Sequence, residues 1–433
     1  MTSSSENIVY VNEFVDLVGP ETDMLGPVKD GGQIVTGTEP ACYGPMITPE
    51  VESGHTISRP VAVAGAEVGD GVALRIKTIK ITSRAAASGT ETPREGSFVG
   101  DPFVAKKCPG CGKVNPNTVV KGIGRDAICC ADCDTSVSAF DVTSGYTMVF
   151  DDERTVGVTV PSSVAEDIAR NAQDYSGAPA GSTCHSILVF ALADMPAGIV
   201  SRIRPMIGNM GTLPGITMPS SHNAGDFGGF LIGAPHGHAI TVEDLELRTD
   251  AHMDIDSVGE GAIVIAPVKV AQAGIIIGDV HAMQGDGEIA GHTTDVSAEV
   301  TLEVEIIKNL ANDGPILLPL MKDLPPLAQL PTVEELESAR SLAGRSGFDI
   351  QNAVAPIQVV GSGANLNEAT MNGLERMAKI ADMDVDEVKN RVTITGGIEI
   401  GRLPGMVHIS MLTPLSRLEQ IGIAHLVKEQ YGL

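Results

Sequence analysis

The chain has few aromatic and few basic side chains. Tryptophan is absent from its 433 residues, and aromatic residues make up only 3%. A hydrophobic core must therefore be built from Val, Ile, Leu, Ala and Met. Lysine and arginine number 29 against 55 acidic residues, which gives a formal charge of -26. Because such a surface repels nucleic-acid phosphates, a role in nucleic-acid binding is disfavoured.

Long apolar runs are also missing. The most hydrophobic segment, 261–278, is interrupted by Pro267, Lys269 and Gln272, so it predicts two buried strands and not a membrane span. The opening MTSSSENIVYVNEFV lacks the basic and apolar regions of a secretory signal. We therefore expect a cytoplasmic protein with no membrane partner.

Turn-forming residues are abundant and organise the chain. The 49 glycines and 26 prolines favour many turns between short strands. Residues 1–103 are predicted to be β-rich, with the polar stretch 84–103 as a mobile loop or arm. Residues 104–137 hold a cysteine module, 138–312 return to short strands, and 313–433 mix helices with strands. The predicted fold class is α+β: a mostly antiparallel, β-rich body of sandwich or barrel type, a C-terminal α/β part and an inserted zinc ribbon.

Capping signals and apolar periodicity predict the individual elements of the last third. PTVEELESARSLAG at 331–344 begins with a Thr N-cap and acidic residues and ends at a Gly, as a helix does. Further helices are predicted at 162–172 with Ser162 or Ser163 as cap, at 367–383 with a continuation through DVDEVKNRV, and at 416–430. Strands are predicted at 61–81 around a turn, at 392–401 and at 406–411.

Five of the seven cysteines cluster between positions 108 and 133. Cys108 and Cys111 form one C-x-x-C pair, and Cys130 and Cys133 form a second, a spacing typical of a tetrahedral zinc site. Cys129 could replace Cys130 as ligand. Four thiolates would fill the coordination sphere, so the expected zinc is structural and staples a small lobe. The alternative is a module for protein contact or gating.

A second group of potential ligands lies between residues 252 and 288. If HMDID is a strand, its period of two places His252, Asp254 and Asp256 on one face. The same rule places Asp279 and His281 of GDVH together. Buried carboxylates and imidazoles are costly unless they are paired or bind a metal, so the pattern predicts a divalent metal site. The alternative is a set of solvated polar faces and loop acids.

Asp286 and Glu288 lie shortly after GDVH, in the segment GDGE. The whole region resembles a known family. GDVHAMQGDGEIAG at 278–291 is similar to the signature of the acetamidase/formamidase enzymes. Weaker similarities lie at 61–76, 252–268 and 391–411, in the same order as in the family. The resemblance implies the corresponding β-rich fold, hydrolysis of short amides to a carboxylate and ammonia, a bound divalent metal and a homo-oligomer.

Several features depart from the family pattern and leave the substrate open. The cysteine module is an addition, His252 stands where Asn is common, and the tail GEIAGHTTD differs. One alternative is therefore hydrolysis of a larger or cyclic amide, an amidine or a urea-like compound. Another is a non-catalytic binding or assembly protein that uses the zinc module.

The residues suggest a catalytic scheme. A metal held by His281 with Asp279 or Asp254 would lower the pKa of a bound water, which then attacks the amide carbonyl. Zinc is the preferred metal, with Ca, Mn or Fe as alternatives. Glu288 is assigned the proton transfer to the leaving amine, and Asp286 either ligates the metal or orients His281.

Other residues are expected to contact the substrate or to be structural. Backbone N–H groups of Gly285 and Gly287 would stabilise the oxyanion. His252, His236 and His222, the last with Asp226 in a Gly-rich loop at 220–229, are candidates for lining the pocket, although loop polarity explains His236 and its neighbour His238 as well. His55, His408 and His425 are expected to be ordinary satisfied histidines.

Overall fold

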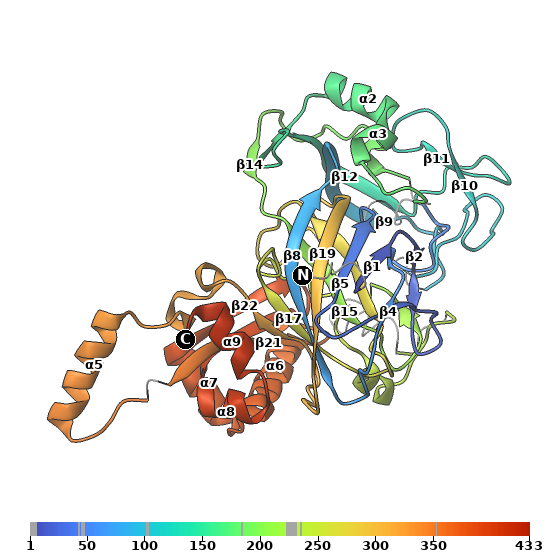
Figure 1. The fold of residues 1–433 in the computed structure, drawn as a ribbon. Coiled ribbons are helices and arrows are strands. Elements are labelled where there is room, and N and C mark those ends of the chain that lie inside the picture. Colours follow the sequence, from blue (N-terminus) through green and yellow to red (C-terminus); the bar gives the residue numbers. More distant parts are fainter. Residues whose placement is uncertain are drawn as a thin grey trace.

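Two β-sheets form the centre of the molecule, with a lobe at one end and a helical part at the other (Figure 1). The computed structural model describes residues 7–41, 44, 48–100, 104–182, 185–221, 232–233, 236–351 and 353–433. The predicted fold class is confirmed, because the body is β-rich and most strand pairs within these residues are antiparallel.

The larger sheet has nine strands in the described part of the chain and is antiparallel except for the pair β1 and β5. Its strands alternate as a half-buried sheet requires: in β19, Val300 and Leu302 are buried while Glu299 is exposed. In spatial order its strands are β1 (Ile8–Val11), β5 (Gln33–Thr38), β19 (Ala298–Ile307), β8 (Gly71–Ile81), β17 (Ile263–Pro267), β20 (Ile316–Leu318), β21 (Val354–Ser362), β23 (Met406–Pro414) and β22 (Gly396–Arg402).

A second sheet packs on the first and carries much of the site described below. It contains β2 (Phe14–Val15), β6 (Ile57–Ser58), β18 (Ile275–His281), β7 (Val61–Val63) and β4 (Leu25–Val28), and β15 (Met206–Thr212) also pairs with β18. Residues of both sheets, such as Leu302 and Ile277, share one apolar cluster. A short pair, β3 (Leu17–Val18) with β16 (Met218–Pro219), lies beside this sheet.

The end lobe contains the cysteine module (Figure 1). Its apolar cluster unites Cys108 and Cys130 with Phe140 and Phe190, so the module packs on the lobe. The lobe consists of β9 (Ala85–Pro93), β12 (Phe140–Phe150), β13 (Val156–Thr159), β14 (Val200–Arg202), the pair β10 (Thr118–Val120) and β11 (Ile128–Cys130), helices α2 (Ser162–Arg170) and α3 (Ala172–Ser176), and the 3-10 helix η1 (Ile187–Phe190).

Two predictions for the lobe are wrong. The stretch 84–103 was expected to be a loop, but its residues 85–93 form β9, which pairs with β12. The small side chains at its start, including Ala85 and Ala87, are buried. Helix α2 is present, but its N-cap is Pro161 and no side chain caps it. The sequence could not show this, because either serine satisfies the local cap pattern.

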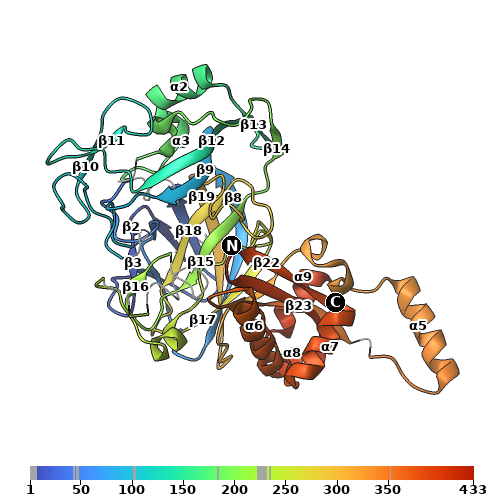
Figure 2. The same cartoon turned by 180° about the vertical axis from the view of Figure 1, so that it is seen from behind.

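The C-terminal part covers one face of the larger sheet with helices (Figure 2). Helices α6 (Leu366–Ala381), α7 (Val385–Thr395), α8 (Leu415–Gln420) and α9 (Ala424–Tyr431) bury apolar residues against β21 and β23. Helix α5 (Val333–Ser346) has the predicted N-cap at Thr332, which forms a capping box with Glu335, and the helix projects from the body in both views. Short 3-10 helices complete the described elements: η2 (Glu243–Leu247), η3 (Met321–Asp323) and η4 (Pro326–Ala328).

The predicted C-terminal elements hold with shifted ends. Residues 392–395 belong to α7, so the strand expected at 392–401 begins at Gly396. The helix expected at 416–430 is two helices, α8 and α9, with Gly422 at a positive φ of 83° between them. None of the helices in the described residues is long and apolar enough to cross a membrane.

A buried ion-pair network joins the C-terminal part to the sandwich. Asp250 is fully buried, and its two oxygens accept from Arg248 Nε and Arg376 Nη2 at 2.7 Å each. Arg376, on α6, also donates to the Val360 carbonyl in β21 at 2.8 Å. Burial alone would raise the pKa of Asp250, but the two guanidinium groups hold it well below its ordinary value.

Asp250→Asn is expected to lower the free energy of unfolding by about 3–5 kcal/mol, because it leaves two partly buried cations without their anion. The stabilisation should be fully present above the unfolded-state pKa of about 3.9 and should be lost as pH falls from there toward the depressed pKa of the folded state. Denaturant unfolding at several pH values measures both effects. Asp386→Asn, which removes an exposed pair with Lys389, should cost less than about 1 kcal/mol. Equal costs for the two variants would contradict the assignment.

Candidate active site

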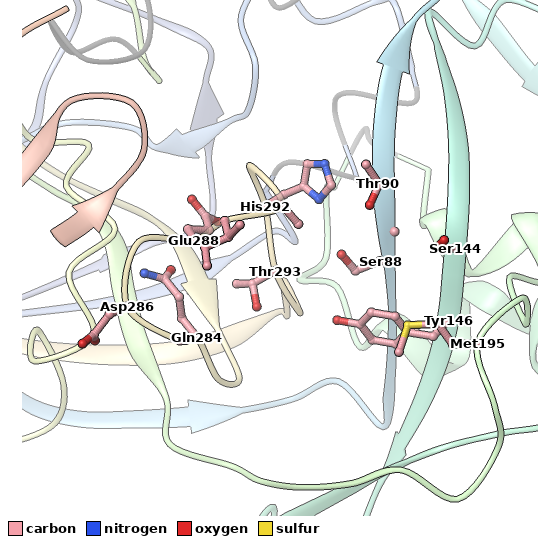
Figure 3. Close-up of a pocket in the computed structure, with 14 residues that line it drawn as sticks. Ser88, Thr90, Ser144, Tyr146, Met195, Gln284, Asp286, Glu288, His292 and Thr293 are labelled. Carbon is pink, nitrogen blue, oxygen red and sulfur yellow. The ribbon is translucent and has the colours of Figure 1, made fainter. Parts of the chain in front are cut away.

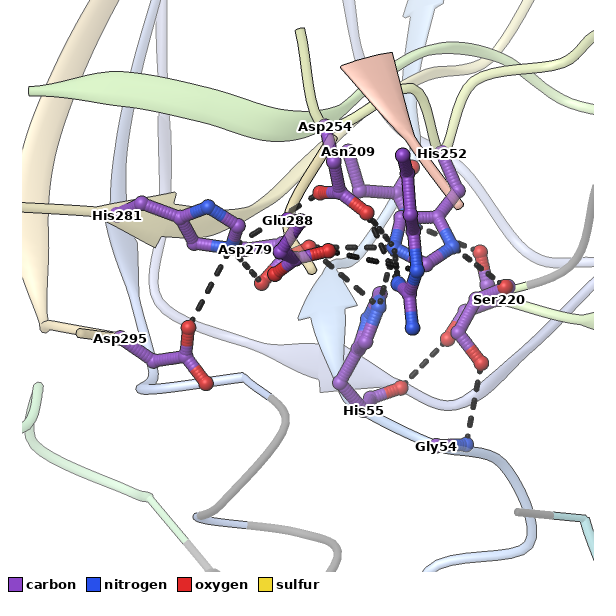
Figure 4. A network of polar contacts seen from close by, with 12 residues as sticks. Gly54, His55, Asn209, Ser220, His252, Asp254, Asp279, His281, Glu288 and Asp295 are labelled. Atoms are coloured by element: carbon purple, nitrogen blue, oxygen red, sulfur yellow. Dashed lines mark hydrogen bonds and ion pairs between the residues drawn. The ribbon is translucent and has the colours of Figure 1, made fainter. Parts of the chain in front are cut away.

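The end of β18 places Asp279 and His281 side by side in the interior (Figure 4). Both side chains are fully buried, and His281 Nε2 lies 2.9 Å from Asp279 Oδ1. They share a face of the strand, as the alternation predicts. The neighbouring residues Val280 and Ala282 point into the apolar core, which fixes the strand and therefore these two polar side chains.

The HMDID segment reaches the same place by a different route from the one predicted. It is not a strand: His252 makes one isolated bridge to Asn209, and Asp254 has a positive φ of 50°. His252 and Asp254 nevertheless meet at 2.9 Å inside the cluster. Asp256 turns away and pairs with Arg204, which also contacts Asp323. The prediction that all three side chains share a strand face is therefore wrong.

Three residues C-terminal to β18 complete the cluster. Glu288, in the loop after β18, is 3% exposed. Arg402, at the end of β22, donates to Asp254 Oδ2 at 2.9 Å and lies 3.4 Å from Glu288 Oε2 through its Nε. Asp295 lies 3.3 Å from His281 Nε2. Four buried carboxylates are thus gathered around one guanidinium and several imidazoles.

The backbone is bent to bring the carboxylates together. Asp254, Asp279 and Glu288 all have positive φ angles, of 50°, 56° and 40°. Such conformations cost free energy for residues with a Cβ and concentrate at functional sites. Gly208 on β15 makes the room: a Cβ there would overlap Asp254 Oδ1 and would lie 2.6 Å from Asp279 Oδ2.

Hydrogen bonds at Nδ1 fix two histidines. His252 Nδ1 lies 2.6 Å from the Ser221 carbonyl, and because a carbonyl only accepts, Nδ1 carries the proton. His281 Nδ1 lies 2.8 Å from Gln284 Oε1. The Gln284 amide nitrogen donates to the Asp254 carbonyl at 2.5 Å, which orients its oxygen toward His281. In both rings Nε2 therefore points into the cluster, the arrangement common in metal-binding histidines.

Carboxylate oxygens converge on the Nε2 atom of His281. Asp279, Asp295 and Asp254 approach it to 2.9, 3.3 and 3.9 Å, while Nδ1 of the same ring donates to Gln284. Asp254 Oδ1 and both oxygens of Glu288 accept no hydrogen bond within the described residues. Burying so many acceptors without donors is costly, so the arrangement calls for positive charge at the centre.

The pKa shifts reflect the same imbalance. Burial and then the neighbouring Asp254 raise the pKa of Glu288 well above its ordinary value. Burial alone would lower the pKa of His281, but the Asp279 and Asp295 carboxylates raise this pKa well above its ordinary value. Burial alone would raise the pKa of Asp279, yet the His281 and His55 imidazoles hold this pKa well below its ordinary value.

His55 belongs to the cluster, so the prediction that it is an ordinary structural histidine is wrong. Its Nε2 lies 3.4 Å from His252 Nε2 and 3.7 Å from Asp279 Oδ2 (Figure 4). The sequence held little signal for it, because it stands more than 190 residues from its partners. The sequence also held little signal for Asp295 and Arg402, because each is a single charged residue next to an apolar strand.

Three overlapping sets of side chains could hold a metal ion in this cluster. Within each set the potential ligand atoms lie within 4.8 Å of one another. Asp279 and His281 each occur in two of the sets. The sets are His55 with His252 and Asp279, Asp254 with His281 and Glu288, and Asp279 with His281 and Asp295.

A cavity of about 340 Å³ reaches the cluster from outside (Figure 3). Glu288 and Gln284 line it on the cluster side, and Ser88 and Tyr146 of the lobe face them. The opening is therefore bounded by the loop after β18 and by strands β9 and β12. Among the carboxylates of the cluster, Glu288 lines the cavity, and Asp279 is more deeply buried.

The remaining predicted residues of the loop lie around this cavity and not in the cluster. Asp286 is exposed and lines the cavity with Gly285. Burial, followed by the nearby Asp256, raises the pKa of Asp286. The Gly287 N–H donates to the Ile400 carbonyl at 2.9 Å, so it is engaged and does not serve as the predicted oxyanion donor.

Other predicted histidines differ in placement. His236 Nδ1 accepts from the His238 backbone N–H at 3.2 Å. His222 and Asp226 lie outside the described residues. His408 is buried with Nδ1 3.7 Å from Glu399, and the exposed His425 pairs with Glu305, so these two are structural as expected.

The cysteine module presents four sulfur atoms to one point. Cys108 Sγ lies 3.4 Å from Cys133 Sγ, and Cys111 Sγ lies 3.9 Å from Cys130 Sγ. Ligands about 2.3 Å from a tetrahedral zinc are separated by roughly 3.8 Å. Cys129 points elsewhere, with its Sγ 3.6 Å from the Asp126 carbonyl, so Cys130 is the fourth member of the set. These four cysteines, called the thiolate site below, could hold a metal ion.

Comparison with known proteins gives a consistent result. A model of the Acetamidase/Formamidase family matches residues 30–246 and 238–415, which is most of the chain. A search of curated proteins finds no match.

Solved structures share the fold at low sequence identity. A predicted acetamidase/formamidase from Thermoanaerobacter tengcongensis superimposes with a TM-score of 0.52 and 17% identity, covering 96% of this chain and 98% of that one. An acetamidase from Bacillus halodurans gives 0.52 and 16%, with 96% and 99% covered. An acetamidase from Yersinia enterocolitica gives 0.52 and 15%, with 96% and 93% covered. The resemblance inferred from the sequence is confirmed: the chain belongs to the acetamidase/formamidase family and is an amide hydrolase of that family.

Proposed function

We propose that the protein hydrolyses a small carboxamide to a carboxylate and ammonia at a divalent metal centre formed by the buried cluster. One observation carries the proposal. Three carboxylate oxygens converge on His281 Nε2 while its Nδ1 is committed to Gln284. A cation at this point would satisfy the acceptors and complete the hydrogen-bonding pattern that metal-binding histidines show.

The residues present fit such a centre. Asp279 would be the central ligand, because its Oδ1 lies 2.9 Å from His281 Nε2 and its Oδ2 lies 3.3 Å from His252 Nε2. A divalent ion there supplies Lewis acidity, which polarises the amide carbonyl and lowers the pKa of a coordinated water. Imidazole and carboxylate donors favour zinc, and manganese or iron suit the same set.

Glu288 is the residue placed to move protons. It is the carboxylate of the cluster that also lines the cavity, and its raised pKa suits a group that takes a proton from water and gives it to the leaving amine. Arg402 Nε, 3.4 Å away, holds its carboxylate in place. Gln284 orients His281 and closes the floor of the cavity.

A larger amide is the second candidate substrate, and the cavity volume favours it. Acetamide has four heavy atoms, each about the size of a water molecule of ~30 Å³. A cavity of about 340 Å³ holds roughly three times as much. The hydroxyl groups of Ser88, Tyr146 and Thr293 in its wall suit a polar, uncharged extension of the amide.

We propose further that the thiolate site binds zinc in a structural role. Four thiolates leave no position for water or substrate, and the pair of three-residue strands β10 and β11 has little core of its own.

Glu288→Gln should retain the metal and lower kcat by about 10²–10⁴-fold, because the amide keeps the shape but cannot accept a proton. Ammonia release from a panel running from formamide to longer hydroxylated amides measures kcat and KM. Glu337→Gln, an acid-to-amide change on the exposed face of α5, is the matched control and should be fully active. Wild-type turnover in Glu288→Gln would discard the role.

Metal analysis of purified protein should find ions of two kinds. A mild chelator should remove the histidine- and carboxylate-bound metal and abolish ammonia release, and adding Zn²⁺ or Mn²⁺ back should restore it. The thiolate-bound ion should stay, since a closed four-sulfur site exchanges less readily than an open one. Full activity in protein that has lost its chelatable metal would refute metal dependence.

Gly208→Ala should weaken binding of the chelatable metal at least tenfold, because its Cβ would displace the Asp254 and Asp279 carboxylates. Gly344→Ala in α5, whose Cβ would meet nothing within 4 Å, is the control. Equilibrium dialysis with Zn²⁺ compares the two. Unchanged affinity in Gly208→Ala would show that these carboxylates do not hold the ion.

A further inference from the structure

The segment 48–55 leads directly into His55 and is held from the lobe side by the cysteine module. Thr118 of β10 contacts two residues of this segment. Its hydroxyl lies 2.9 Å from the Thr48 hydroxyl, and its backbone N–H and hydroxyl both donate to the Glu50 carboxylate, the hydroxyl at 2.7 Å. Thr118 is also the cross-strand partner of Cys130, a member of the thiolate site.

Lys106 makes a second connection. It precedes Cys108 by two residues, is only 1% exposed, and donates through Nζ to the Ser53 carbonyl at 3.3 Å. Ser53 in turn donates its hydroxyl to the His55 carbonyl at 2.8 Å. Burial of an ammonium group is costly, so its position must be enforced by the surrounding fold.

His55 depends on these backbone contacts more than the other histidines do. His252 and His281 are each oriented by a carbonyl-type oxygen at Nδ1. The Nδ1 atom of His55 has no hydrogen-bond partner within the described residues. The direction of its Nε2 toward Asp279 is therefore set by the path of segment 48–55.

We propose that an ion in the thiolate site positions His55 through Lys106 and Thr118, so that the donor set of His55, His252 and Asp279 reaches full metal affinity only when the thiolate site is filled. The strand pair β10 and β11 is too short to be stable alone, and four thiolates around one ion would fix it. The inference rests on the proposed active-site metal. It makes Lys106 a positioning residue and couples two metal sites in one chain.

A double-mutant cycle on the full-length protein tests the coupling. Co²⁺ is the probe, because thiolate-bound cobalt absorbs differently from cobalt held by nitrogen and oxygen, and a competing chelator gives the affinity of each site. In Lys106→Met, Co²⁺ should fill the thiolate site normally, and the affinity of the nitrogen/oxygen site for Co²⁺ should fall at least tenfold. Cys111→Ser with Cys133→Ser should abolish the thiolate signal and weaken the second site by a similar factor. Combining all three changes should cause no further loss.

Matched variants separate positioning from a general loss of structure. Lys113→Met removes an exposed lysine of the same module, paired with Asp132, and should leave both affinities unchanged. Lys106→Arg should restore much of the affinity. If Lys106→Met does not fold, Thr118→Val cuts the other connection without leaving a charge unpaired and should weaken the same site.

The outcomes distinguish this inference from the proposed function. Equal nitrogen/oxygen-site affinity in wild type, Lys106→Met and the cysteine variant, or weakening that simply adds in the triple variant, would overturn the coupling and leave the active-site metal intact. Wild-type protein that binds no cobalt outside the thiolates would refute the proposed metal centre itself.

Discussion

A surplus of buried carboxyl groups is the constraint around which the site is organised. Asp254, Asp279, Glu288 and Asp295 are all buried within reach of His281 or Arg402. Such a cluster would not persist without compensation, because unpaired buried carboxylates cost several kcal/mol each. The two packed sheets supply the rigidity that keeps the charges together, and a bound cation would balance them.

The charged side chains of the cluster come from several segments of the body. β18 delivers Asp279 and His281, with Asp279 itself at a positive φ, while Asp254 and Glu288 come from positive-φ positions outside the strands. Gly208 leaves the space that the Asp254 and Asp279 carboxylates occupy. The nine-stranded sheet continues into the C-terminal part and brings Arg402 to the cluster, so the last third of the chain contributes directly to the site.

The lobe has two functions in this architecture. Its strands β9 and β12 form one wall of the cavity, and its cysteine module holds the segment that carries His55. Under the proposed coupling, a change in the module would reach His55 by a short path of hydrogen bonds.

The sequence by itself determined the family, the fold class, the spacing of the four clustered cysteines and the pair Asp279 and His281, because these depend on local periodicity or on a contiguous motif. It could not place His55 or Arg402, whose proximity arises only when distant strands pair, or Asp295, which reaches His281 through the turn of the chain after β18. It also misplaced Asp256, since the direction of a side chain in irregular backbone follows from tertiary contacts and not from alternation. The strand at 85–93 was missed for a related reason: its small residues carry little strand signal of their own, and β9 forms by pairing with β12.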